Sequence, residues 1–262
     1  MIDTHCHIDE EAFAADREEV IAQQQANGVE AMIVPGVNVA SIDTVLDVCR
    51  RHKGFCFPAL GLHPEDVKED WETALATIEK AIRANRQDLV AIGEIGLDYY
   101  WDTTHKEAQK EVLRRQLRLA RELDLPVILH NREATEDILR ILKEVQLENA
   151  ERPLRGVFHC YSGSKETAEQ ILKMGFYLGI GGVLTFKNSK LKDTIKDLND
   201  SHLLLETDAP YMAPVPHRGE RNESRFMTHI VDVLASSLGR TPEEIIALTT
   251  ANAKQLFLLN VR

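Results

Sequence analysis

Short runs rich in β-branched and other apolar residues alternate along the chain with longer stretches in which apolar residues recur every three or four positions. The short runs predict eight strands: Ile2–His7, Ala31–Pro35, Phe57–Gly61, Leu89–Glu94, Val127–His130, Gly156–His159, Tyr177–Ile180 and Leu203–Asp208. The longer stretches have the period of amphipathic helices; examples are Trp71–Arg86, Lys106–Leu123 and Lys165–Met174. Regular alternation of strand and helix is typical of parallel sheets with crossover helices.

Eight such units predict an α/β fold in which the sheet closes into a (β/α)₈ TIM barrel, with an open doubly wound sheet as the alternative. No glycine-rich loop follows the first predicted strand, so a dinucleotide-binding fold is disfavoured. We see no linker, low-complexity segment or longer repeat, and we predict one domain over residues 1–262. Ser41 and the run Thr241-Pro242-Glu243-Glu244 are typical of helix starts.

The composition changes this picture mainly through charge. Hydrophobic residues make up 44% of the chain and charged residues 28%, which is ordinary for a globular protein and excludes a disordered one. Lys and Arg number 31 against 42 Asp and Glu, so the net charge is −11. A protein this acidic has no overall attraction for phosphate backbones, which argues against a passive nucleic-acid-binding module. An enzyme that uses metal ions locally is compatible with this charge.

The sequence also bears on location. No apolar run approaches the roughly 18 residues of a membrane span, and the start at Met1 lacks the features of a signal peptide. The four cysteines, Cys6, Cys49, Cys56 and Cys160, form no CxxC pair and are expected to be free thiols. We therefore expect a cytoplasmic protein, a monomer or weak oligomer, with no membrane contact and no stable protein partner.

Candidate metal ligands gather at the predicted strand ends. In a barrel of this type the active site lies at the C-terminal ends of the strands. The polar residues expected there are His5, His7, Glu94, His130, His159 and Asp208. Side-chain alternation places His5 and His7 on one face and Cys6 on the other. Any one of these residues alone would be more typical of a polar core position, but their joint placement at five strand ends predicts a metal centre. Imidazole and carboxylate ligands in this number suit two divalent ions better than one.

Three motifs resemble the signatures of the TatD family of metal-dependent hydrolases. They are Ile2-Asp3-Thr4-His5-Cys6-His7-Ile8-Asp9, Leu125-Pro126-Val127-Ile128-Leu129-His130-Asn131-Arg132 and Leu203-Leu204-Leu205-Glu206-Thr207-Asp208-Ala209-Pro210-Tyr211. Intervening blocks match in order, among them Gly61-Leu62-His63-Pro64, Gly93-Glu94-Ile95-Gly96-Leu97-Asp98 and Arg221-Asn222-Glu223. The resemblance implies a TIM-barrel, deoxyribonuclease-like phosphodiesterase with a binuclear metal site. One departure is Ser224, which stands where the family usually has proline.

We expect a defined role for each ligand. His5, His7 and Asp208 would hold one ion, His130 and His159 the other, and Glu94 would bridge them. The cofactors would be two divalent ions, of Zn, Mn, Mg or a similar metal. Such ions lower the pKa of a water towards neutrality, and Asp208 is the expected acceptor of its proton. The catalytic residues are therefore Asp208 and Glu94.

Four further residues are candidates for contacts with substrate or with the ligands. His63 follows the third predicted strand and either contacts the substrate or a metal ligand, or is simply part of a turn. Glu206 lies two residues before Asp208 and is expected to orient a ligand histidine. Arg132 and Arg221 are candidates for holding a phosphate, with a surface ion pair and a solvated loop, respectively, as the alternatives.

The preferred function is hydrolysis of phosphodiester bonds in DNA, with RNA as the other candidate nucleic-acid substrate. The main alternative is an amidohydrolase, lactonase or deacylase, because the same ions polarise a carbonyl group equally well. A non-catalytic metal-binding protein is a weaker alternative, since both the bridging glutamate and Asp208 are present.

Overall fold

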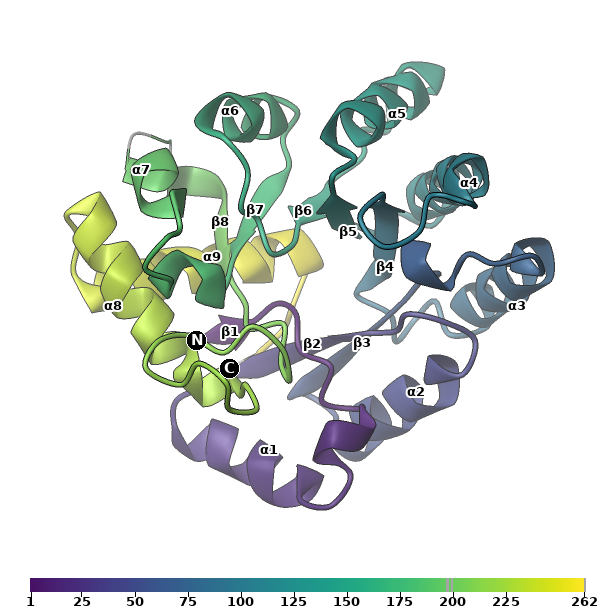
Figure 1. Cartoon of the computed structure of the whole chain (residues 1–262). Coiled ribbons are helices and arrows are strands. Elements are labelled where there is room, and N and C mark those ends of the chain that lie inside the picture. Colours follow the sequence, from purple (N-terminus) through teal and green to yellow (C-terminus); the bar gives the residue numbers. More distant parts are fainter. Residues whose placement is uncertain (197, 199, 262) are drawn as a thin grey trace.

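The computed structural model describes residues 1–196, 198 and 200–261. Eight parallel strands lie in sequence order in one sheet, which curls into a barrel (Figure 1). The strands are β1 Ile2–Asp3, β2 Ala31–Pro35, β3 Cys56–Leu60, β4 Ala91–Asp98, β5 Val127–Arg132, β6 Gly156–Phe158, β7 Tyr177–Ile180 and β8 Leu203–Leu205. The predicted (β/α)₈ TIM barrel is thereby confirmed.

Helices surround this barrel on its outside. They are α1 Arg17–Ala26, α2 Ser41–Arg51, α3 Trp71–Ala84, α4 Lys106–Leu123, α5 Thr135–Glu148, α6 Lys165–Lys173, α7 Leu191–Lys196, α8 Met227–Leu238 and α9 Pro242–Phe257. Thr241 caps α9 with the reciprocal bonds of a capping box to Glu244. Ser41 is the first residue of α2 and not its cap; its hydroxyl accepts from the amides of Val37 and Asn38. Within the described residues, no helix is both long and apolar enough to span a bilayer.

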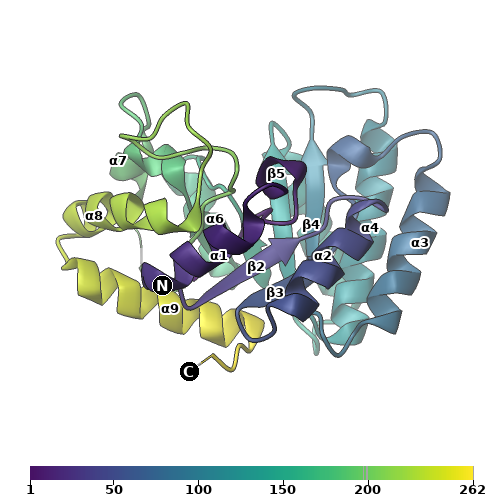
Figure 2. The ribbon, with the colours of Figure 1, turned by 90° about the horizontal axis from the view of Figure 1, so that it is seen from below.

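The last helix lies across the bottom of the barrel, at the end opposite the long loops (Figure 2). Leu256 and Phe257 of α9 pack against residues that line the barrel interior, including Ile33, Ile128 and Leu204. Alternate residues of the same strands, such as Met32, point outwards into the larger core beneath the helices. The bottom is therefore filled, and the open end of the barrel is the C-terminal end of its strands.

Hydrogen bonds beyond the ends of β1 and β8 close the barrel. The amide of Thr4 donates to the carbonyl of Leu205 at 3.0 Å, and the amide of His7 donates to that of Ala209 at 2.8 Å. The amide of Cys6 instead turns to β2 and donates to Ile33. The predicted ends of the first and last strands at His7 and Asp208 are therefore wrong: β1 ends at Asp3 and β8 at Leu205, and beyond them only isolated hydrogen bonds continue the pairing.

The fourth strand runs further than predicted and carries an irregularity at Glu94. The sequence placed the strand over Leu89–Glu94, whereas β4 extends to Asp98. Its pairing with β5 skips a residue between Ile92 and Ile95, which is the signature of a bulge. A bulge redirects side chains, and here it turns Glu94 into the barrel mouth while the strand continues to Asp98.

Candidate metal centre

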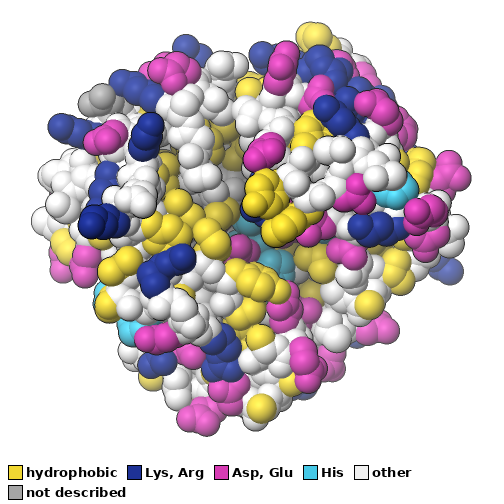
Figure 3. Space-filling model, in the orientation of Figure 1, with side chains coloured by type: hydrophobic (Ala, Val, Ile, Leu, Met, Phe, Trp, Pro, Cys, Tyr) yellow, Lys and Arg dark blue, Asp and Glu magenta, His cyan; other side chains and the backbone are white. Residues whose placement is uncertain are grey.

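The six predicted ligands lie together at the open end of the barrel. They come from the segments after β1 and β8, from β4 and β5, and from the residue that follows β6. Figure 3 shows histidine side chains on the floor of a central hollow on this face, with hydrophobic side chains beside them. Most of these groups are buried, with His5 inaccessible to solvent and Asp208 the most exposed at 18% of its side chain. The strand ends thus bring distant parts of the sequence to one site.

Glu94 lies at the centre of the group and faces both halves of it. Its Oε2 is 3.1 Å from Nε2 of His5. Its Oε1 is 2.7 Å from Nε2 of His159 and 3.0 Å from Nδ1 of His130. One carboxylate oxygen therefore faces each set of histidines, which is the arrangement that a bridging ligand requires.

Each half forms a compact set of nitrogen and oxygen atoms. In the first half, the Nε2 atoms of His5 and His7 are 3.1 Å apart, and Oδ1 of Asp208 is 3.6 Å from both. In the second half, Nε2 of His159 lies 3.4 Å from Nδ1 of His130 beside Glu94. Within each half, the potential ligand atoms all lie within 4.8 Å of one another, so each half has the dimensions of a metal site.

The chemistry of the donor set fits divalent cations. Three ring nitrogens crowd around the carboxylate of Glu94: Nε2 of His5, Nε2 of His159 and Nδ1 of His130. The rings of His5 and His159 are also stacked, with centroids 4.0 Å apart. Nitrogen and oxygen donors gathered at this spacing suit divalent cations, and the mixture of imidazole and carboxylate is one that Zn²⁺ and similar ions prefer.

The pKa values of these groups reflect burial and their close neighbours. Burial lowers the pKa of His5 to about 4. Burial acts in the same direction on His7 and His130, but adjacent carboxylates outweigh it and raise both pKa values to about 9. Burial likewise opposes ionisation of Glu94 and Asp208, yet the surrounding histidines hold the pKa of each below its ordinary value. The carboxylates are therefore ionised, and His7 and His130 carry protons that an incoming cation has to displace.

Sequence reasoning assigned no role to Asp98, which the structure places against a candidate ligand. Its Oδ2 lies 2.8 Å from Nε2 of His130. Asp98 is buried at the end of β4, and its other oxygen accepts from the amide of Tyr100 at 2.9 Å. The sequence feature that could have indicated this role is spacing, because Asp98 follows Glu94 by four residues on a strand that ends at the open end of the barrel.

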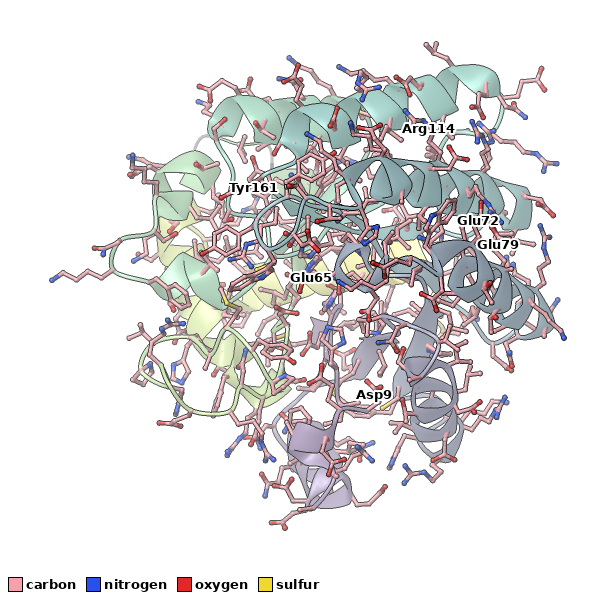
Figure 4. All side chains as sticks on the ribbon, turned by 45° about the vertical axis from the view of Figure 1, so that its right-hand side comes forward. Asp9, Glu65, Glu72, Glu79, Arg114 and Tyr161 are labelled. Carbon is pink, nitrogen blue, oxygen red and sulfur yellow. The ribbon has the colours of Figure 1, made fainter. Side chains whose placement is uncertain are left out.

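His63 and Glu206 both lie against the centre. Nε2 of His63 is 3.3 Å from Oε1 of Glu94, and its Nδ1 accepts from the amide of Glu65 at 3.2 Å. In Figure 4, Glu65 lies near the middle of the view, whereas Glu72 and Glu79 lie on the outer helix α3.

Glu206 is fully buried, and its Oε1 accepts a hydrogen bond from the amide of Cys160 and lies 3.8 Å from Nδ1 of His159. Burial raises the pKa of Glu206 to about 8. Gly179 leaves room for this side chain, because a Cβ at that position would overlap the Glu206 carboxyl group.

The two predicted phosphate-binding arginines have different surroundings. Arg221 is fully engaged: its guanidinium donates to both carboxylate oxygens of Asp16 at 2.7 and 2.8 Å, to Glu223 and to the carbonyl of Ala12. The guanidinium of Arg132 has no hydrogen bond or ion pair within the described part of the chain and stacks over the ring of Tyr100 at 3.7 Å. Arg132 therefore has free N–H donors beside the centre, whereas Arg221 ties loops together.

Backbone strain is concentrated at this rim. Apart from glycine, six described residues have positive φ, and two of these, Asp124 and Leu258, end helices. The other four are Glu133, Cys160, Asp208 and Met212, all on segments that follow β5, β6 and β8. Asp208 itself has a φ of 59°. Left-handed backbone at non-glycine residues is unfavourable and gathers at functional sites, so this loop geometry is consistent with a site built to hold Asp208 in place.

The family model described as TatD related DNase matches residues 2–258. The chain belongs to the TatD family. It is 42% identical to an uncharacterized metal-dependent hydrolase, YabD of Bacillus subtilis, over 99% of this chain and 100% of that protein. It is 34% identical to the 3′-5′ ssDNA/RNA exonuclease TatD of Erwinia tasmaniensis, over 99% and 100%. The crystal structure of YjjV, a TatD homologue from Escherichia coli, superposes with a TM-score of 0.90 at 34% identity and covers 98% of both chains. This protein is thus a metal-dependent hydrolase of the TatD family.

Proposed function

We propose that this TatD-family protein is a nuclease that hydrolyses phosphodiester bonds of single-stranded DNA or RNA with the help of two divalent ions. The observation that carries the proposal is the position of Glu94, which directs one oxygen to His5 and the other to His130 and His159. Relatives named as ssDNA/RNA exonucleases support the choice of substrate. Four free cysteines support a reducing, cytoplasmic setting.

His5, His7 and Asp208 would hold one ion, His130 and His159 the second, and Glu94 both. Bound there, the ions supply positive charge that lowers the pKa of a nearby water and offsets the charge of a phosphodiester group. Their positive charge would also offset, at the site, the repulsion between a nucleic acid and a protein with a net charge of −11.

Asp208 is suited to accept the proton of the attacking water. Its pKa is held low by His7 and the other histidines despite burial, so the carboxylate is ionised and able to act as a base. Its side chain is 18% exposed against 4% for Glu94, so Asp208 is the carboxylate that faces the mouth, where water and substrate enter. A base must reach the proton it removes, and this exposure meets that requirement.

Arg132 is suited to bind a substrate phosphate. The guanidinium group provides paired N–H donors for phosphate oxygens, and those of Arg132 are free beside His130. Bound there, a phosphate would be held at the edge of the centre while the scissile phosphate lies over it. Arg221 would act indirectly: its hydrogen bonds to Asp16 fix the segment that follows β8 against the segment before α1.

The test is a metal-reconstitution screen against four substrates: single-stranded DNA, single-stranded RNA, bis-p-nitrophenyl phosphate and a lactone. The metal-loaded protein should cleave the phosphodiesters, and Asp208→Asn protein loaded with the same metal should not. Hydrolysis of the lactone with intact nucleic acid would overturn the proposal in favour of a carbonyl substrate.

A further inference from the structure

Exposed aromatic side chains stand beside the candidate metal centre. Among the described residues, the large aromatic side chains that are more than 40% exposed are Tyr100 at 49%, Trp101 at 66% and Tyr211 at 52%. All three lie on segments that follow β4 or β8, at the open end of the barrel. Single exposed apolar residues are common on protein surfaces, but adjacent exposed aromatics at the mouth of a site are typical of ligand contacts.

Tyr100 and Trp101 form one unit with Arg132. The two rings meet edge to face, with centroids 4.6 Å apart. The guanidinium of Arg132 lies 3.7 Å from the centroid of Tyr100 and 5.1 Å from that of Trp101, within the range of cation–π attraction. Tyr100 is thereby covered on one side by the arginine, while most of the Trp101 surface faces solvent.

The same backbone that holds the metal centre holds this unit. The amide of Tyr100 donates to Oδ1 of Asp98, whose other oxygen contacts His130. The amide of Tyr99 donates to the carbonyl of Arg132 at 3.0 Å, and the Tyr99 hydroxyl donates to Asp137 at 2.7 Å. The aromatic pair therefore has a fixed position relative to the candidate ligand His130, and is not carried by an untethered loop.

The unit combines the groups that recognise one nucleotide. A flat, solvent-facing indole offers a surface for a base, and the free guanidinium beside it offers donors for the attached phosphate. We propose that Trp101 and Tyr100 form a stacking platform for an unpaired nucleobase, next to Arg132, which binds the phosphate of the same nucleotide. This proposal rests on the proposed nuclease function and adds how the strand is held.

Two consequences follow from stacking as the source of binding. Stacking is sequence-tolerant and needs no positive charge, which suits a protein with a net charge of −11 that lacks a general attraction for phosphates. A base inside a duplex already has its faces covered by its neighbours, so only an unpaired base can lie on Trp101. The platform would therefore favour single strands over duplexes.

Fluorescence of Trp101 tests the contact directly. The sequence has two tryptophans, so Trp71→Phe leaves Trp101 as the only reporter. The metal-loaded Trp71→Phe variant is titrated with a single-stranded oligodeoxyadenylate whose phosphorothioate linkages resist hydrolysis. We expect saturable quenching by the single strand and little by the same strand in a duplex. Binding of a dye-labelled strand without any change in Trp101 fluorescence would overturn the proposal.

A comparison of strands with and without bases separates stacking from a structural role. The second strand carries the same phosphates on abasic tetrahydrofuran units. The unaltered protein should bind the strand with bases about tenfold more tightly, and Trp101→Ala should abolish that preference, because stacking on an aromatic side chain contributes an effect of this order. Trp101→Phe should retain most of it. Leu147→Ala, which removes another exposed apolar side chain, should change nothing. An equal loss on both strands in Trp101→Ala would contradict stacking.

The two proposals fail in different ways. If metal-loaded protein cleaves no single strand, the nuclease function fails, and the fluorescence titration still decides whether Trp101 binds bases. If it cleaves single strands and Trp101→Ala leaves KM and the preference for bases unchanged, the platform fails and the nuclease function stands.

Discussion

The Nε2 atom of His130 lies 2.8 Å from Oδ2 of Asp98, while the opposite ring nitrogen faces Glu94 at 3.0 Å. A carboxylate in this position accepts the Nε2–H of the imidazole, so the proton that a metal ion displaces is the one on Nδ1, which faces the candidate metal site. Carboxylates that hold a ligand histidine in this way fix its tautomer and orientation. Asp98 is therefore a positioning residue for the second half of the centre.

Loss of this carboxylate should weaken one ion and spare the other. Asp98→Ala is expected to lower the affinity for the ion beside His130 by about 10- to 100-fold, with little effect on the ion held by His5 and His7. Competition with a chelator measures both affinities. Asp102→Ala, at an exposed position on the loop that follows β4, is the matched control. Equal loss of both ions would show that Asp98 supports the whole rim and not His130.

The two arginines should separate binding from stability. Arg132→Ala is expected to raise KM for single-stranded DNA with unchanged metal content and melting temperature, because its guanidinium has no other polar partner within the described residues. Arg221→Ala should instead lower the urea midpoint of unfolding, because Asp16 loses its guanidinium partner and Glu223 is left with its ion pair to Arg225. Steady-state kinetics measures the change in KM, and urea denaturation measures the change in stability. A lower stability in Arg132→Ala with normal KM would reverse the assignment.

The affinity for metal should rise with pH. His7 and His130, one in each half of the site, have pKa values of about 9 because nearby carboxylates outweigh burial. Imidazole binds metal only when the ligating nitrogen is unprotonated, so each ion displaces about one proton at pH 7. The dissociation constant of each ion should therefore fall about tenfold per pH unit between pH 6 and 8. Calorimetric titration in buffers of different ionisation enthalpy measures the protons released, and a value of zero would contradict this.

Without metal, the same histidines should give the opposite dependence of stability on pH. Their folded-state pKa values lie above the ordinary 6.5, so their contribution to stability is complete below pH 6.5 and is lost as pH rises through about 9. Chelator-treated protein should thus lose stability over this range, while metal-loaded protein gains relative to it. Urea midpoints at pH 6 and 9, with and without metal, show both trends.

Asp208→Asn tests the proposed base. An asparagine oxygen can still coordinate an ion, but the amide cannot accept a proton. We therefore expect near-normal metal content and a kcat reduced by at least about a hundredfold, the order attributed to general-base catalysis. Steady-state kinetics at saturating metal measures this. Full recovery of kcat under those conditions would mean that Asp208 only holds the metal.

The sequence predicted the strand order and the convergence of His5, His7, His130, His159 and Asp208, because parallel strands align their C-terminal ends and side chains alternate along each strand. Alternation also separated Cys6, which is buried in the core beneath the helices, from the two histidines. These features follow from periodicity, which can be read without knowledge of tertiary contacts.

Other features depended on tertiary contacts that periodicity does not contain. The bulge in β4 arises from its pairing with β5, and it lets the strand continue past Glu94 to Asp98, which the hydrophobic pattern alone does not predict. The ion pair between Arg221 and Asp16 joins residues 205 positions apart. Ser224 donates a buried hydrogen bond to Asp3 at 2.6 Å, across 221 positions of sequence.

If two ions act together at one site, activity should depend on the number of ions bound to each chain. Chelator-treated protein is titrated with Mn²⁺ or Zn²⁺, and bound metal and cleavage of single-stranded DNA are measured in the same samples. We predict that cleavage rises to a plateau at two ions per chain, and that His130→Ala combined with His159→Ala binds one ion and is inactive. Full activity at one ion per chain, with no further ion bound at saturation, would rule out a binuclear centre.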